Sequence, residues 1–276
     1  MRHVKSAFSY HGAKRSMIAN IKPLLPNNIN VFTELFCGSA VLSFNINANS
    51  YFLNDTNEHI YNFFKVCRKD TTLAKLIHLL EFTPYDKTTY DDAHKTIKDK
   101  DDVQRAWAWW VINCQSFRSL QNTHAIFIPT TERTTPRVRI NQNKIKFLKS
   151  DLFRVIMEKT AITNKDANKF LKFLNKKSPE LYGLFLYADP PYIDTDMKTY
   201  EGTYTTADYK ELLDNLASCP NPFMLSCFET DMSKTYAYTY NWHKYSFVKN
   251  NSMKKQKEEV LYMNYIPSIK LQNSLL

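Results

Sequence analysis

The chain has 276 residues, with 37 Lys and Arg against 27 Asp and Glu and a formal net charge of +10. Hydrophobic residues make up 43% and aromatic residues 14%, which suits a large domain, with or without an insertion, and excludes an intrinsically disordered chain. The positive charge is spread along the sequence and favours a surface for a polyanion such as nucleic acid. On charge alone, a lysine-rich protein without such a partner fits equally well.

The cysteines and the N-terminal residues indicate in which cellular compartment the protein acts and whether it binds a metal. The five cysteines form no CxxC pair and no Cys/His spacing suited to zinc, so we expect free thiols in a reducing compartment and no metal. The first residues, MRHVKSAFSYHG, lack an apolar signal core, and no apolar run approaches the ~20 residues that span a bilayer. We therefore expect a cytoplasmic protein with no membrane partner.

The N-terminal part alternates apolar runs with turn signals. A short helix is expected over 16–25, ending before Pro26, and a half-buried strand over 31–36. After a break at Cys37-Gly38-Ser39, a helix is expected to begin at Ala40. A second strand over 51–55 and a helix through Cys67 complete a βαβα unit, which predicts a parallel sheet flanked by helices.

Between residues 68 and 150 the pattern changes to short helical stretches joined by polar segments. Trp107, Trp110, Val111 and Cys114 are spaced i, i+3, i+4 and i+7, which predicts one apolar helical face. We interpret the tryptophans as core residues, with stacking on nucleic-acid bases as the lesser alternative.

A basic hairpin is predicted over 137–147, because Arg137-Val-Arg-Ile140 and Lys144-Ile-Lys-Phe147 each alternate basic with apolar residues around Asn141-Gln-Asn143. One face would bury the apolar side chains and the other would present Arg137, Arg139, Lys144 and Lys146. A basic two-stranded ribbon fits the DNA major groove. The alternative is an ordinary solvated face of an antiparallel pair.

After residue 150 the α/β pattern returns. The apolar run over 184–188 is typical of a central parallel strand, and another strand is expected over 223–228. The segments 243–248 and 259–265 alternate as an antiparallel hairpin. One α/β domain therefore brackets the segment 68–149.

The most informative motif is Asp189-Pro190-Pro191-Tyr192, which follows the buried strand at 184–188. Ligands bind at the carboxyl ends of strands in open α/β sheets. The prolines keep the chain extended, so that the neighbouring carbonyls stay free as acceptors. A carboxylate and a carbonyl can together accept both hydrogens of an exocyclic amine, and Tyr192 offers a face for the base. The alternative is an exposed turn at the strand end.

A second group suggests a cofactor that contains a nucleoside. Gly38 lies at the bend after the first strand, where it lets the backbone approach a ligand, and Asp55 ends the next strand, where it can accept ribose hydroxyls. The absence of G-x-G-x-x-G argues against a dinucleotide site that binds pyrophosphate.

Together these segments resemble the Dam type of DNA adenine-N6 methyltransferase, the D12 class of the alpha group of amino-methyltransferases. Eight stretches carry the resemblance: Ser9–Lys14, Phe32–Ser39, Leu53–Glu58, Ile162–Asp166, Asp189–Tyr192, Tyr204–Leu213, Leu225–Ser226 and Lys257–Tyr265, in which Glu259 marks the last motif. By resemblance, the catalytic residues are Asp189, Pro190, Pro191 and Tyr192. The residues that bind the cofactor are Tyr10, Gly12, Lys14, Glu34, Phe36, Cys37, Gly38, Ser39, Ala40, Asp55, Asp166 and Asp189.

The resemblance implies a Rossmann-like methyltransferase sheet with helices on both faces, formed by 1–67 and 150–276, and a mainly helical target-recognition insertion over 68–149. The expected activity is transfer of a methyl group from S-adenosyl-L-methionine to adenine N6 in double-stranded DNA, by base flipping. Residues expected to bind DNA are Lys14, Arg118, Arg133, Arg137, Arg139, Lys144 and Lys146. Alternatives are a cytosine-N4 methyltransferase, which more often has Ser at position 189, a glutamine-methylating protein modifier, which more often has Asn there, and a DNA-binding protein with a vestigial cofactor site.

The same resemblance implies a prokaryotic or phage-encoded protein that is a monomer in solution, and it allows a restriction endonuclease partner. Two positions depart from the family. Ala40 stands where a second glycine is usual in the cofactor loop, and residues 117–139 lack the stretch typical of members that methylate GATC. The target sequence is therefore left open.

Overall fold

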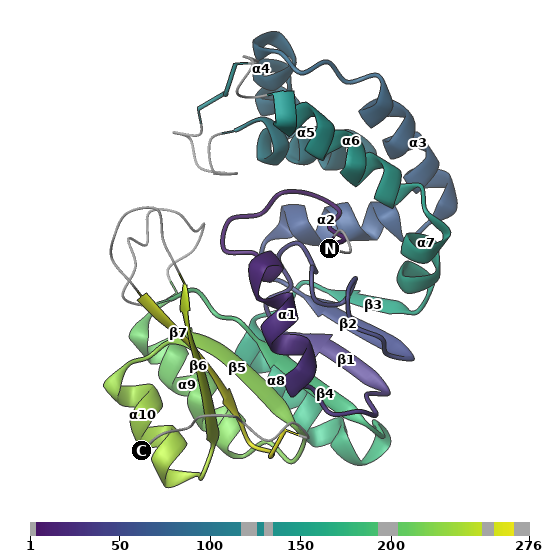
Figure 1. The fold of residues 1–276 in the computed structure, drawn as a ribbon. Helices are drawn as coiled ribbons and strands as arrows, with labels where there is room; N and C mark the ends of the chain where they lie inside the picture. Colours follow the sequence, from purple (N-terminus) through teal and green to yellow (C-terminus); the bar gives the residue numbers. More distant parts are fainter. Residues whose placement is uncertain (1–3, 117–125, 130–134, 193–203, 250–256, 268–276) are drawn as a thin grey trace.

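The computed structural model describes residues 4–116, 126–129, 135–192, 204–249 and 257–267 (Figure 1). Its sheet has the strand order β3-β2-β1-β4-β5-β7-β6. Within that sheet, β7 pairs antiparallel with β5 and β6, whereas the pairings among β1 to β5 are parallel. The order reverses between β1 and β4, which is where a doubly wound sheet binds its ligands.

The strands are β1 (Val31–Glu34), β2 (Ser50–Asn54), β3 (Thr160–Thr163), β4 (Leu184–Ala188), β5 (Phe223–Phe228), β6 (His243–Lys249) and β7 (Lys257–Met263). In register, Glu34 at the end of β1 lies opposite Leu53 on one side and Tyr187 on the other. The segments that follow β1, β2 and β4 therefore leave the sheet at one edge. The expected parallel sheet and the closing antiparallel hairpin are confirmed; β3 is a strand that the sequence patterns did not indicate.

The helices are α1 (Ile18–Ile21, between short 3-10 helices at Lys14–Met17 and Lys22–Leu24), α2 (Glu58–Cys67), α3 (Asp70–Glu81), α4 (Lys87–Thr96), α5 (Asp102–Gln115), α6 (Thr135–Leu148), α7 (Asp151–Glu158), α8 (Ala167–Lys177), α9 (Thr206–Ala217) and α10 (Asp231–Thr239). A further 3-10 turn, Ser178–Glu180, follows α8. Several helices begin at side-chain caps: Asn57 accepts from two amides of α2, and Asp101 from two amides of α5.

Helices cover both faces of the sheet, as expected. Side chains of α1, α2 and α7 pack on one face, and those of α8, α9 and α10 pack on the other. The central strand β4 is buried throughout and sends alternate residues into the two clusters, which explains its continuous apolar sequence.

The helices α3 to α6 gather beside α2 at one end of the molecule (Figure 1). Helix α5 lies among them and contacts α2, α3 and α4. Trp110 is buried and its Nε1 donates to the carbonyl of Ala7 at 3.0 Å, while Nε1 of the half-buried Trp107 donates to Thr83 Oγ1 at 2.7 Å. The interpretation of these tryptophans as core residues is therefore confirmed, and one apolar core continues from the sheet into this cluster.

Two local predictions are wrong. The segment 137–147 is part of helix α6 and not a β-hairpin. An alternation of only four residues also fits a helix. The two basic segments are seven residues apart, so that Arg137 and Lys144 share one helical face, and Pro136 in the first turn is a helix-start signal. The helix expected at Ala40 is instead a series of turns closed by the bonds from Phe44 N to Ala40 O and from Ile46 N to Leu42 O.

Among the residues that the structure describes, no helix has the length and apolar character needed to cross a bilayer. The five cysteines are buried free thiols, as expected. No group of three metal-ligating side chains occurs within the same described ranges.

Candidate active site

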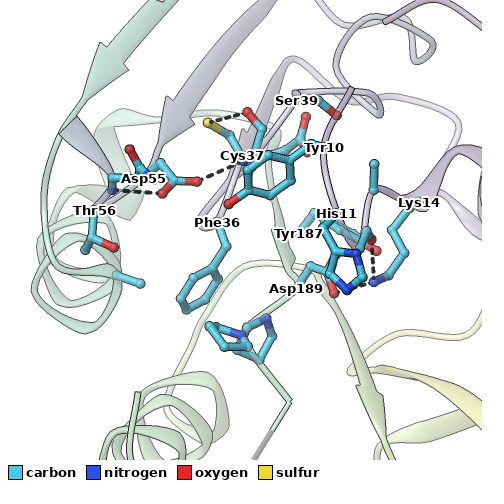
Figure 2. Close-up of a pocket in the computed structure, with 18 of the residues that line it drawn as sticks. Tyr10, His11, Lys14, Phe36, Cys37, Ser39, Asp55, Thr56, Tyr187 and Asp189 are labelled. Atoms are coloured by element: carbon cyan, nitrogen blue, oxygen red, sulfur yellow. Dashed lines mark hydrogen bonds and ion pairs between the residues drawn. The ribbon is translucent and has the colours of Figure 1, made fainter. Parts of the chain in front are cut away.

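A cavity of about 500 Å³ opens where β1, β2 and β4 end, at the reversal of strand order (Figure 2). Fourteen of the residues singled out from the sequence line it: Tyr10, Gly12, Lys14, Glu34, Phe36, Cys37, Gly38, Ser39, Asp55, Asp166, Asp189, Pro190, Pro191 and Tyr192. These residues come from segments far apart in the chain, and the parallel sheet brings them to one edge. The cavity size and the mixed polar and aromatic lining suit a small organic cofactor.

The loop after β1 is held in a tight conformation. Cys37 N donates to Asn54 O at 2.8 Å, and Gly38 N donates to Asp55 Oδ2 at 2.9 Å. Gly38 has φ +47°, and a Cβ there would lie 2.9 Å from two carbons of the Tyr10 ring, which lies beside this loop (Figure 2). Glycine is therefore required both by the left-handed backbone and by the close approach of the ring.

Ala40 is the predicted cofactor residue that does not line the cavity. It is fully buried, has φ +49°, and donates its N–H to the carbonyl of Cys37 at 2.7 Å. An L-residue pays roughly 1–2 kcal/mol for this conformation. The loop thus keeps the backbone geometry that favours glycine although it carries a methyl group there.

Two acidic residues that line the cavity are Asp55 and Asp166. Asp55 accepts from Gly38 N and, at 3.0 Å, from Asn57 N, and burial raises its pKa to about 6 despite these two bonds. Asp166 caps α8 through Lys169 N at 3.0 Å. Both side chains line the cavity and can accept hydrogen bonds there.

Glu34 lies beneath the cavity with its side chain nearly inaccessible to solvent. Its Oε1 accepts from Ser43 N at 2.9 Å and from Ser43 Oγ at 2.5 Å. Burial raises its pKa to about 8, and the nearby carboxyls of Asp189 and Asp55 add to the shift. Glu34 is therefore mainly a neutral acid near pH 7.

Asp189, which also lines the cavity, belongs to a buried polar cluster. Lys14 Nζ lies 2.7 Å from Asp189 Oδ1 and 3.2 Å from Glu259 Oε1. Tyr192 Oη donates to Glu259 Oε1 at 2.7 Å and lies 3.3 Å from both Asp189 Oδ1 and Ser226 Oγ. Burial raises the pKa of Asp189, and the Lys14 ammonium lowers it part of the way back. Burial lowers the pKa of Lys14, but the two carboxylates outweigh it and raise the pKa overall.

The ring of Tyr192 packs against Phe228, with centroids 4.3 Å apart, and Lys14 Nζ lies 5.0 Å from its centroid. Glu259 on β7 marked only the last motif in the sequence, yet it contacts this cluster. Its signal was a carboxylate that directly precedes the apolar run Val260–Met263. Ten further lining residues were not among the predicted site residues: His11, Ala13, Val41, Leu42, Thr56, Asn57, Ala167, Tyr187, Tyr204 and Asp208.

Of the described residues predicted to bind DNA, Lys14 lines the cavity, and the others lie on two sides of helix α6. Arg118 and Arg133 lie outside the described residues. On α6, Arg137 is half-buried and donates to Ser116 O at 3.3 Å, while Lys144 is buried and donates to Ser9 Oγ at 2.6 Å and Asn141 Oδ1 at 3.1 Å. Arg139 and Lys146 are exposed on a different side of the helix.

Comparisons with known proteins show the family of the chain. A model of the D12 class of N6 adenine-specific DNA methyltransferases matches residues 10–264. Modification methylase StsI of Streptococcus sanguinis is 25% identical over 292 residues, which cover 96% of this chain and 43% of the relative. Type II methyltransferase M.FokI of Planomicrobium okeanokoites is 24% identical over 288 residues, which cover 95% and 43%. The chain thus spans less than half the length of these relatives.

Among solved structures, the rRNA methyltransferase aviRa from Streptomyces viridochromogenes superimposes with a TM-score of 0.38 at 10% identity, covering 92% of this chain and 86% of that one. A similarity this low carries no argument about the chain.

Proposed function

Since the chain belongs to the D12 class of N6 adenine-specific DNA methyltransferases, we propose that it methylates adenine N6 in double-stranded DNA with S-adenosyl-L-methionine as the methyl donor. The observation that carries this proposal is the position of Asp189-Pro190-Pro191-Tyr192. The motif follows the central strand β4 and lines one cavity with the Gly38 loop and Asp55.

The cavity fits the proposed cofactor in two respects. Gly38 forms a cradle that a Cβ would disturb, and Ser39 Oγ is buried there without a hydrogen-bond partner among the described residues. We propose that Asp55 accepts from ribose hydroxyls, that Asp166 accepts from the adenine amine, and that Tyr10, Phe36 and the backbone of the Gly38 loop enclose the cofactor. When bound, S-adenosyl-L-methionine supplies a methyl group already activated by the sulfonium charge.

The catalytic step assigned to the protein is to orient the target amine. Asp189 and the carbonyl of Pro190 would accept its two hydrogens, which withdraws the nitrogen lone pair from the ring and aims it at the methyl group. Pro190 and Pro191 lack an N–H, so the motif offers acceptors and no competing backbone donors at these positions. Fixing the amine in this geometry accounts for most of the rate enhancement. Before the target adenine can enter the cavity, it must leave the stack of bases in the DNA duplex, which costs a few kcal/mol.

We propose that residues 1–67 and 150–276 form the catalytic part and that 68–149 form the target-recognition part. In support, the cavity is lined by residues before 58 and after 165, whereas α3 to α6 form a separate layer of helices. The charge of +10 supports a polyanionic substrate. The two relatives, a modification methylase and a type II methyltransferase, support a further proposal, that the methylation protects DNA from a restriction endonuclease.

The test is transfer of labelled methyl groups from S-adenosyl-L-methionine to duplex DNA, followed by digestion to nucleosides and mass spectrometry. N6-methyladenine is the expected product; N4-methylcytosine would favour the cytosine-specific alternative, and a labelled protein would favour a protein modifier. Asp189→Ala should lower kcat at least about 100-fold, whereas the matched control Asp151→Ala, an exposed residue of α7, should retain activity. If cofactor and DNA both bind but nothing is methylated, a non-catalytic DNA-binding protein is the better description.

A further inference from the structure

The two carboxylate oxygens of Asp189 are used unequally. Lys14 Nζ at 2.7 Å and Tyr192 Oη at 3.3 Å both approach Oδ1, and no hydrogen bond from a described residue reaches Oδ2. Tyr192 has a single hydroxyl hydrogen, and its shorter contact is to Glu259 at 2.7 Å. Lys14 is therefore the main donor to Oδ1.

Lys14 is itself fixed in place. Its side chain is 6% exposed, and its three hydrogens have three acceptors in reach: Asp189 at 2.7 Å, Glu259 at 3.2 Å and the carbonyl of Gly12 at 3.5 Å. Glu259 is 2% exposed. From β7 it accepts hydrogen bonds from both Lys14 and Tyr192. With these three contacts Lys14 has no further hydrogen to offer a DNA phosphate or a cofactor carboxylate.

We propose that Lys14, held by Glu259, is a positioning residue that acts through Asp189: its ammonium fixes Oδ1 and so leaves Oδ2 to accept the target amine. The proposal rests on the proposed function, because it assigns a role within methyl transfer to the target amine. It replaces direct binding of cofactor or DNA as the role of Lys14.

The charge of Lys14 also matters for the state of Asp189. The groups that act on this carboxyl come from every neighbouring element: Lys14 from the first 3-10 helix, Glu259 from β7, Tyr192 from the motif itself, and Tyr187, Glu34 and Cys227 from β4, β1 and β5; His11 lies beside it (Figure 2). Among these groups the Lys14 ammonium lowers the pKa of Asp189 the most. Without it, burial and Glu259 would both favour the protonated acid, which accepts a hydrogen bond poorly.

The central experiment compares the wild type with Lys14→Met, which keeps the length of the side chain and removes its charge. Loss of one charged hydrogen bond predicts a decrease in kcat of about 10- to 150-fold. The acid limb of the kcat–pH profile should move to higher pH, and the dissociation constants for S-adenosyl-L-methionine and duplex DNA should stay within about threefold. Lys22→Met, an exposed position eight residues further along the same N-terminal segment, is the matched control and should change none of these quantities.

A second variant makes the proposal falsifiable where Lys14→Met does not fold. Glu259→Gln removes the charge that holds Lys14, and it should lower kcat and alter the same limb of the pH profile. In the double variant the two losses should be less than multiplicative, because both act through Asp189. Unchanged kcat and pH profile in both single variants would overturn the proposal. So would a higher KM for cofactor or DNA at unchanged kcat, because Lys14 would then be a ligand of that molecule.

Failure of the proposed function would be recognised separately, because the wild type would then transfer no methyl group. In that event urea unfolding still tests the inference. Lys14→Met should destabilise the protein more at pH 8, where Asp189 would be an unpaired buried carboxylate, than at pH 5, where it can be protonated. An equal loss at both values of pH would overturn the proposal.

Discussion

Replacing Glu34 by Gln should change how the stability of the protein depends on pH. Glu34 is buried, and its pKa rises from an ordinary 4.5 to about 8, mainly because burial disfavours the charged form. A carboxyl whose pKa is raised on folding contributes its stability below the unfolded pKa and loses it as pH rises through the folded value. Gln keeps the shape and an oxygen that can accept from Ser43, but it does not titrate.

The magnitude follows from linkage at about 1.36 kcal/mol per pH unit. With pKa values of 4.5 unfolded and about 8 folded, ionisation of Glu34 disfavours the folded state by about 2 kcal/mol at pH 6 and about 5 kcal/mol at pH 9. The free energy of unfolding of Glu34→Gln should therefore increase relative to that of the wild type by about 3 kcal/mol between these two values of pH.

The assay is urea denaturation followed by tryptophan fluorescence at several values of pH from 6 to 9 and at constant ionic strength. The difference between variant and wild type removes the titration of every unaffected group. Glu180→Gln is the control, since this side chain is 66% exposed and its variant should keep a constant difference. If the difference for Glu34→Gln is also constant, Glu34 is ionised in the folded protein and the reasoning from its burial is refuted.

Two further predictions concern the cofactor loop and α6. Gly38→Ala should destabilise the protein by at least about 1 kcal/mol, through its positive φ and its contact with the ring above it, and should weaken S-adenosyl-L-methionine binding at least tenfold in a thermal-shift titration. Gly183→Ala also has positive φ and a close contact but lies outside the cavity; it should destabilise without weakening binding, and equal losses of affinity would contradict this account of the loop. Arg139→Ala and Lys146→Ala are substitutions on the exposed side of α6. Each should reduce by about 1 the slope of a plot of the logarithm of the binding constant for duplex DNA against the logarithm of the salt concentration. The exposed Lys176 of α8 gives the control substitution, and an equal change there would show that α6 has no special part in binding.

Much of the site could be predicted because parallel strands must all end at one edge of a sheet. The apolar run before Asp189 identified a central strand, and the bend at Gly38 and the acid at Asp55 followed two others. Once these strands pair in parallel, their carboxyl ends meet whatever the rest of the chain does. This explains why eleven of the fourteen predicted residues line one cavity, since they end or follow β1 to β4.

The same local patterns failed for residues 137–147, because four alternating residues satisfy a strand and a helix equally well. Packing decided between them. In α6 the side of the helix with Lys144 turns toward Ser9 and Cys114 and is buried, while Arg139 and Lys146 stay in solvent. A row of four like charges on one face therefore does not exist in the folded chain.

The sequence by itself thus determined the parallel sheet flanked by helices, the order of the motifs and the residues at the strand ends, since these follow from local periodicity and from the geometry of parallel strands. Only the tertiary structure decided the cluster of Lys14, Asp189 and Glu259. Lys14 and Glu259 lie near opposite ends of the chain, and no spacing or period relates them. They meet because β7 inserts beside β5 and because buried carboxylates need a donor that the fold must supply.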